Sequence, residues 1–78
     1  MAELQWEYER EGIFYACFGR LRLVVGPIKI RTGCTFTVLT PLAGGKDVWA
    51  AVGSGHCETV AEAQVAATTM AIRFKTAH

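Results

Sequence analysis

Apolar and polar residues alternate along most of the first half of the chain, and this pattern predicts β-strands. In residues 4–10, Leu4, Trp6 and Tyr8 alternate with polar neighbours. A period of two residues is typical of a strand that buries one face. The Glu11-Gly12 pair that follows predicts a turn into a second strand.

Residues 13–18 and 20–25 form the clearest predicted hairpin. Gly19-Arg20 joins them, and a two-residue loop with glycine first suits a type II′ turn. We expect one face of the hairpin to hold the cross-strand pairs Phe18–Leu21, Ala16–Leu23 and Phe14–Val25. The other face holds Ile13, Tyr15, Cys17, Arg22 and Val24. Both faces are rich in apolar residues, yet only one can face the core. We therefore expect the second face to contact a partner.

Two further strands are expected in the middle of the chain. Residues 27–33 alternate apolar and basic positions, which predicts either an irregular edge segment or a long exposed loop. Residues 34–40 are rich in β-branched side chains and predict a fourth strand. Residues 41–46 predict a loop, and residues 47–52 a short fifth strand. We expect Gly53-Ser54-Gly55 to lead out of that strand into a helix.

The predicted helix starts at Thr59, because Thr59 and Glu62 have the spacing of a capping box. Its apolar residues form a stripe about 100° wide, as expected of a helix packed on a core. The stripe comprises Val60, Ala63, Ala67, Met70, Ala71 and Phe74. We expect Met70 and Phe74 to be buried against the sheet. The predicted fold is α+β: one domain, residues 1–78, with an antiparallel meander of about five strands and one C-terminal helix packed on one face.

Composition indicates that this small domain exposes apolar surface. The chain has 78 residues, of which 51% are hydrophobic even without glycine. An average soluble chain has about 45–50% apolar residues with glycine included. A contiguous exposed apolar surface usually marks a contact with another molecule, so we expect a homodimer. The expected dimerisation residues are Ile13, Cys17 and Val24 on the hairpin, with Val65 and Ile72 on the helix.

Charge is nearly balanced overall but unevenly distributed. The net charge is +1, while four of the seven acidic residues lie within residues 1–11. Four of the eight basic residues lie within residues 20–31. We expect the partner-binding site to comprise Tyr15, Arg22, Lys29 and Arg31. The alternative is that Arg22 pairs with an acidic residue of the first strand, Glu7 or Glu9.

The sequence shows no catalytic, metal or cofactor motif. His56 and Cys57 are neighbours without an orienting acid, and the three cysteines and two histidines lack zinc-site spacing. The glycine runs do not match phosphate-binding loops. We expect a protein that is not an enzyme, with Cys34 and Cys57 as thiols. With neither a signal-peptide pattern nor an apolar stretch that would cross a membrane, we expect cytoplasmic localisation and no membrane partner.

Several segments together resemble small accessory proteins of phages and other mobile elements, including anti-CRISPR inhibitors. They are W-x-Y, G-I-F-Y-A, R-L-x-V-V, a tryptophan in the last strand, and G-x-x-x-T-V-x-E-A before an alanine-rich helix. The resemblance implies a protein that binds a bacterial CRISPR-Cas or other defence complex in the host cytoplasm and blocks its access to DNA. The alternative is a module for single-stranded nucleic acid, because Tyr15 and Arg22 on an open sheet, with Trp49 as a further candidate, offer stacking and charge.

Overall fold

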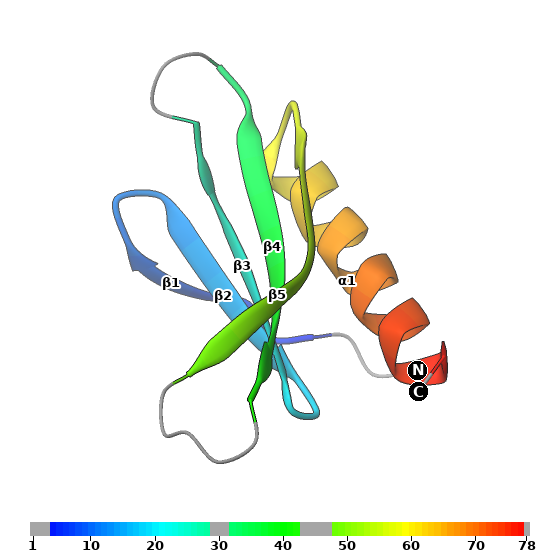
Figure 1. The fold of residues 1–78 in the computed structure, drawn as a ribbon. Helices are drawn as coiled ribbons and strands as arrows, with labels where there is room; N and C mark the ends of the chain where they lie inside the picture. The colour runs from blue at the N-terminus through cyan, green and yellow to red at the C-terminus, as the bar shows by residue number, and fades with distance from the viewer. Residues whose placement is uncertain (1–3, 29–31, 43–47, 78) are drawn as a thin grey trace.

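A computed structural model of the chain describes residues 4–28, 32–42 and 48–77. It contains one five-stranded antiparallel sheet in the order β1-β2-β3-β4-β5, followed by one helix (Figure 1). The elements are β1 (Glu7–Arg10), β2 (Ile13–Phe18), β3 (Leu21–Pro27), β4 (Cys34–Pro41), β5 (Trp49–Cys57) and α1 (Val60–Ala77). The predicted meander with one C-terminal helix is confirmed.

Two tight turns fix the register of the first three strands. Gly19 has φ 62°, and Phe18 pairs with Leu21 on either side of it. A positive φ at the first loop residue matches the predicted type II′ turn. The predicted cross-strand pairs of this hairpin are all present. In the turn between β1 and β2, Glu11 (φ 51°) and Gly12 (φ 80°) are both left-handed, as a type I′ turn requires.

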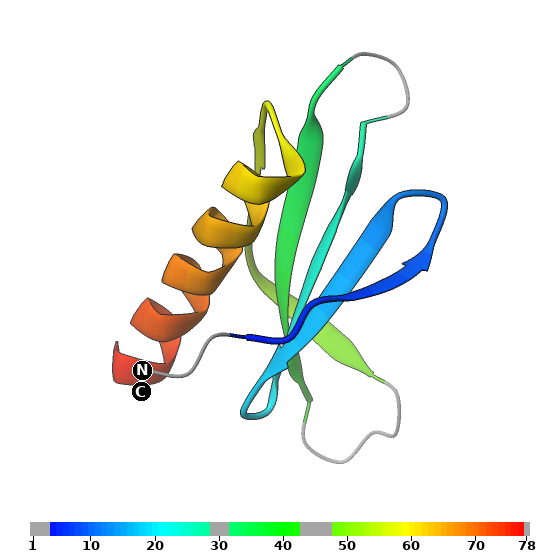
Figure 2. The ribbon, with the colours of Figure 1, turned by 180° about the vertical axis from the view of Figure 1, so that it is seen from behind.

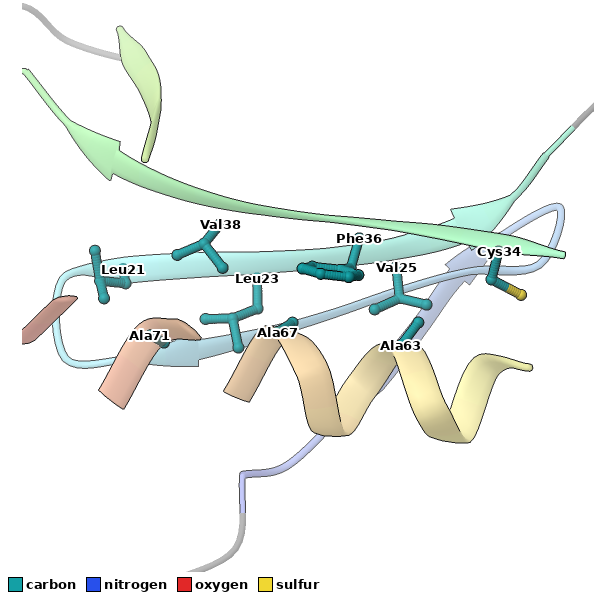
Figure 3. Packing of buried hydrophobic residues seen from close by; sticks show 9 residues of the cluster. All are labelled: Leu21, Leu23, Val25, Cys34, Phe36, Val38, Ala63, Ala67 and Ala71. Carbon is teal, nitrogen blue, oxygen red and sulfur yellow. The ribbon is translucent and has the colours of Figure 1, made fainter. Parts of the chain in front are cut away.

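A single core lies between the helix and one face of the sheet. Alanines on successive turns of α1 face apolar side chains of β3 and β4 (Figure 3). Ala63, Ala67 and Ala71 are fully buried, with no exposed surface. Their small side chains allow the helix backbone to approach the sheet closely. The sheet residues of this core are Leu21, Leu23, Val25, Cys34, Phe36 and Val38.

Met70 and Phe74 pack against the core, as predicted, but they are only partly buried. The alanines occupy the centre line of the helix–sheet contact, and the two larger side chains pack beside it. The first strand is also shorter than predicted. Leu4 and Trp6 pack against the core before β1 begins, whereas Tyr8 is 60% exposed.

The fifth strand differs most from its prediction. It runs through Gly53 and Gly55 instead of ending before them. A β-carbon on Gly55 would lie 2.7 Å from Cζ of the Phe36 ring, and one on Gly53 would collide with the Met70 side chain. These glycines are therefore strand residues that leave room for a ring and for the helix.

The helix begins as predicted. The backbone N–H of Glu62 donates to Oγ1 of Thr59 over 3.2 Å, and the N–H of Ala63 donates to the Thr59 carbonyl over 3.0 Å. Thr59 is therefore the N-cap, immediately before the first helical residue. In the described part of the chain, no helix is long and apolar enough to cross a membrane.

Candidate functional site

The second face of the sheet is uncovered in the part of the chain that the structure describes. Figures 1 and 2 show α1 on one side of the sheet only. Residues on the other side alternate with the core residues along β2, β3 and β4, and each of them is partly or fully exposed. We call this surface the open face. Its residues on β2 to β5 include Ile13, Tyr15, Cys17, Arg22, Val24, Thr35, Thr37, Leu39, Trp49 and Ala51.

Arg22 and Trp49 contact each other on the open face, near one end of the sheet. Cζ of Arg22 lies 4.9 Å from the centroid of the Trp49 ring, a cation–π distance. The two residues come from β3 and β5, and they meet across β4, where Leu39 is the register partner of Arg22. Because the contact joins β3 to β5 over the strand between them, both side chains lie along the surface of the sheet.

Arg22 pairs with neither Glu7 nor Glu9. Among the described residues the one ion pair joins Nε of Arg10 to Oε2 of Glu9 over 3.9 Å, and both of these side chains are at least half exposed. The alternative prediction, in which Arg22 forms an ion pair with Glu7 or Glu9 across the sheet, is therefore not confirmed. Stacking on Trp49 orients the guanidinium, and its N–H donors stay available to another molecule.

Two shallow hollows adjoin each other on the open face. One, of about 360 Å³, is lined by Glu9, Tyr15, Arg22, Val24 and Leu39. The other, of about 410 Å³, is lined by Glu11, Ile13, Val24, Gly26, Pro27, Thr35 and Thr37. Val24 lines both hollows, so they lie next to each other, and we call the two together the concave strip. The strip combines apolar walls with a cation at one end and carboxylates along the β1 side.

The predicted partner-binding residues are partly brought together. Tyr15 and Arg22 line the same hollow. Lys29 and Arg31 lie outside the described residues. The predicted dimerisation residues fall on two separate surfaces. Ile13, Cys17 and Val24 are on the open face, whereas Val65 and Ile72 are on the helix, which packs on the opposite side of the sheet, and Val65 is 67% exposed.

Trp49 and Leu39 belong to the open face but were not among the predicted site residues. Alternation from Val38, a core residue, would place Leu39 on the open face. Trp49 was harder to place, because a register shift between Val38 and Leu39 displaces β5 by one residue relative to β4. An unpredicted shift of this kind changes the face to which each strand residue is assigned.

The structure shows no constellation for metal binding within the described residues. No group of three or more His, Cys, Asp or Glu side chains there is placed to hold a metal ion. His56 and Cys57 are consecutive residues of β5, so their side chains leave the strand on opposite faces. Comparison of the chain with protein-family models, with curated proteins and with solved structures gives no match.

Proposed function

We propose that the chain is a non-enzymatic protein-binding module and that the open face is its contact surface. The observation that carries this proposal is the Arg22–Trp49 stack near one end of an uncovered sheet face. In a small domain, an Arg and a Trp held together outside the core stabilise the fold modestly. The same two residue types dominate the energetics of protein–protein contacts.

The chemistry of the concave strip favours a protein partner. Val24, at the junction of the two hollows, offers an apolar contact, and Tyr15 adds an aromatic ring with a hydroxyl. Arg22, stacked on Trp49, can donate two parallel hydrogen bonds to a carboxylate of the partner. Glu9 and Glu11 at the β1 side complement a partner cation. This mixture of an apolar centre and charges of both signs at the rim is typical of protein interfaces.

A bacterial CRISPR-Cas or other defence complex is the partner class that we propose. The resemblance to small phage accessory proteins supports it, together with the exposed open face, which offers a binding surface. In this role the open face would occupy a protein surface of the complex and block its access to DNA. A net charge near zero is consistent with occupying a protein surface and does not suggest mimicry of DNA.

A single-stranded nucleic-acid module is the second candidate. Tyr15 and Trp49 lie on the same sheet face as Arg22, an arrangement that allows bases to stack beside a cation. The carboxylates of Glu9 and Glu11 border the same strip and repel phosphates. The two candidates therefore differ in the sign of charge that the partner brings to the β1 side.

The two candidates are separated by one pair of measurements on the same variants. Bacteria with an active CRISPR-Cas system are made to express the chain, and the defence complex is purified and tested for the bound chain. Fluorescent single-stranded DNA and RNA are titrated in parallel. We expect the wild-type chain to co-purify with the defence complex. Trp49→Ala should abolish this co-purification, and the helix variant Val65→Asn should retain it. Oligonucleotide binding that weakens steeply with salt, without co-purification, would support the second candidate.

A further inference from the structure

Cys34 and Cys57 are opposite each other at one end of the sheet. Cys34 is the first residue of β4 and Cys57 the last residue of β5, and the two are register partners. Both thiols are free. Cys34 is 7% exposed and belongs to the core beside α1 (Figure 3), and Cys57 packs partly buried against the same core. The two side chains therefore share the helix face of the sheet.

Their backbone positions suit a disulfide. Directly opposed residues of an antiparallel pair have Cα atoms about 4.5–5.5 Å apart, within the range of about 4.4–6.8 Å that disulfides span. Their Cβ atoms, about 4.5–5.5 Å apart in such pairs, need only a small approach to the roughly 3.5–4.5 Å of a disulfide. Both residues terminate a strand, where the backbone yields more readily than at the centre of the sheet.

Cys57 is also reachable from solvent. It lines a hollow of about 610 Å³ together with Ile28, Thr32, Gly33, His56, Glu58 and Thr59. Cys34 is not among the residues that line this hollow. A small disulfide molecule in the hollow would therefore contact Cys57, whereas Cys34 is buried in the core.

We propose that Cys34 and Cys57 form a reversible intrachain disulfide, with a low-molecular-weight disulfide such as oxidised glutathione as the oxidant. The Cys57 thiolate attacks one sulfur of oxidised glutathione, whose S–S bond breaks and releases one glutathione thiolate. The Cys34 thiol loses its proton to solvent, and its thiolate then attacks the Cys57 sulfur and expels the second glutathione. Two protein thiols are thereby oxidised by two electrons, and one oxidised glutathione is reduced to two molecules of glutathione.

The third cysteine provides an internal control. Cys17 is exposed on the open face, where its register partner is Arg22 and not a cysteine. Cleavage after Lys and Arg places the cysteines in three different peptides, residues 11–20, 32–46 and 47–73. The reduced protein is treated with oxidised glutathione, remaining thiols are alkylated with iodoacetamide, and the tryptic peptides are identified by mass spectrometry.

We expect a cross-link between peptides 32–46 and 47–73, in monomeric protein, with Cys17 alkylated or singly glutathionylated. At about 10 µM protein it should exceed any cross-link through Cys17 on the order of 100-fold, because a paired thiol has an effective concentration in the millimolar range. The same cross-link is expected in the Cys17→Ser variant, and excess reduced glutathione should remove it. Oxidation that stops at a glutathione adduct on Cys57, or a dominant cross-link through Cys17, would overturn the proposal.

Discussion

Gly55 of β5 lies against the ring of Phe36 on β4, at a distance that leaves no room for a β-carbon. An added β-carbon would lie 2.7 Å from Cζ and 2.9 Å from Cε1 of this buried ring. The absence of a side chain at this position is therefore part of the core packing. The neighbouring Gly53 has the same relation to Met70, whose flexible side chain can move aside more easily than a ring.

Gly55→Ala should lower the free energy of unfolding by about 1–3 kcal/mol, as overpacking of a filled core does. Gly53→Ala should cost less, because Met70 can adjust. Chemical denaturation of the two variants measures the difference. Ser54→Ala, at an exposed position between them, is the control and should leave stability nearly unchanged. Equal losses in all three variants would contradict the close packing described for the two glycines.

The contact between the helix and the sheet depends on small side chains. Ala67 is fully buried against the sheet, so Ala67→Leu should destabilise the protein by about 1–3 kcal/mol or more. Ala61→Leu makes the same change at an exposed helical position and should have little effect. Thermal unfolding followed by circular dichroism compares them. A tolerated Ala67→Leu would mean that the helix does not approach the sheet as closely as the structure has it.

The helix cap gives a third prediction. Thr59→Ala removes the hydroxyl that accepts the Glu62 N–H and should cost about 0.5–2 kcal/mol without changing the fold. Thr69→Ala, on the exposed side of the same helix, should be neutral or slightly stabilising, because alanine has the higher helix propensity. If urea denaturation gives both variants the same stability as wild type, Thr59 does not act as the cap.

A fourth prediction concerns the left-handed residue in the first turn. Glu11 has φ 51°, a conformation that asparagine tolerates better than glutamate. Glu11→Asn should therefore stabilise the protein, by about 0.5–1 kcal/mol. Glu7→Asn, in the extended strand β1, serves as the control and should bring no such gain. A loss of stability in Glu11→Asn would contradict the type I′ geometry of this turn.

Much of the fold was predictable because local signals agree with one another. The loop Gly19-Arg20 set the hairpin register, alternation set the faces of β2 and β3, and Thr59 marked the helix start. These features depend on residues close together in sequence. The extent of β5 could not be predicted in this way. Gly53 and Gly55 resemble a loop in the sequence, and only the positions of Phe36 and Met70 explain why glycines stand in this strand.

The site was predictable only where it lies on the hairpin. Tyr15 and Arg22 follow from alternation across one short turn. Trp49 meets Arg22 from a strand beyond a longer connection, and its side depends on the register shift between β4 and β5. Neither feature has a local sequence signal. The stacking of Arg22, in preference to an ion pair with β1, likewise depends on this long-range contact.

The binding affinity of the purified chain for its defence complex, measured by calorimetry, is the most direct test of the open face as a contact surface. We predict that Arg22→Ala and Trp49→Ala each raise the dissociation constant by at least about 30-fold, the loss of affinity expected at an interface hot spot. Both variants should keep the wild-type circular dichroism spectrum. Val65→Asn, on the opposite side of the molecule, should bind as wild type does. Wild-type affinity in folded Arg22→Ala and Trp49→Ala, with loss of binding in Val65→Asn, would contradict the account.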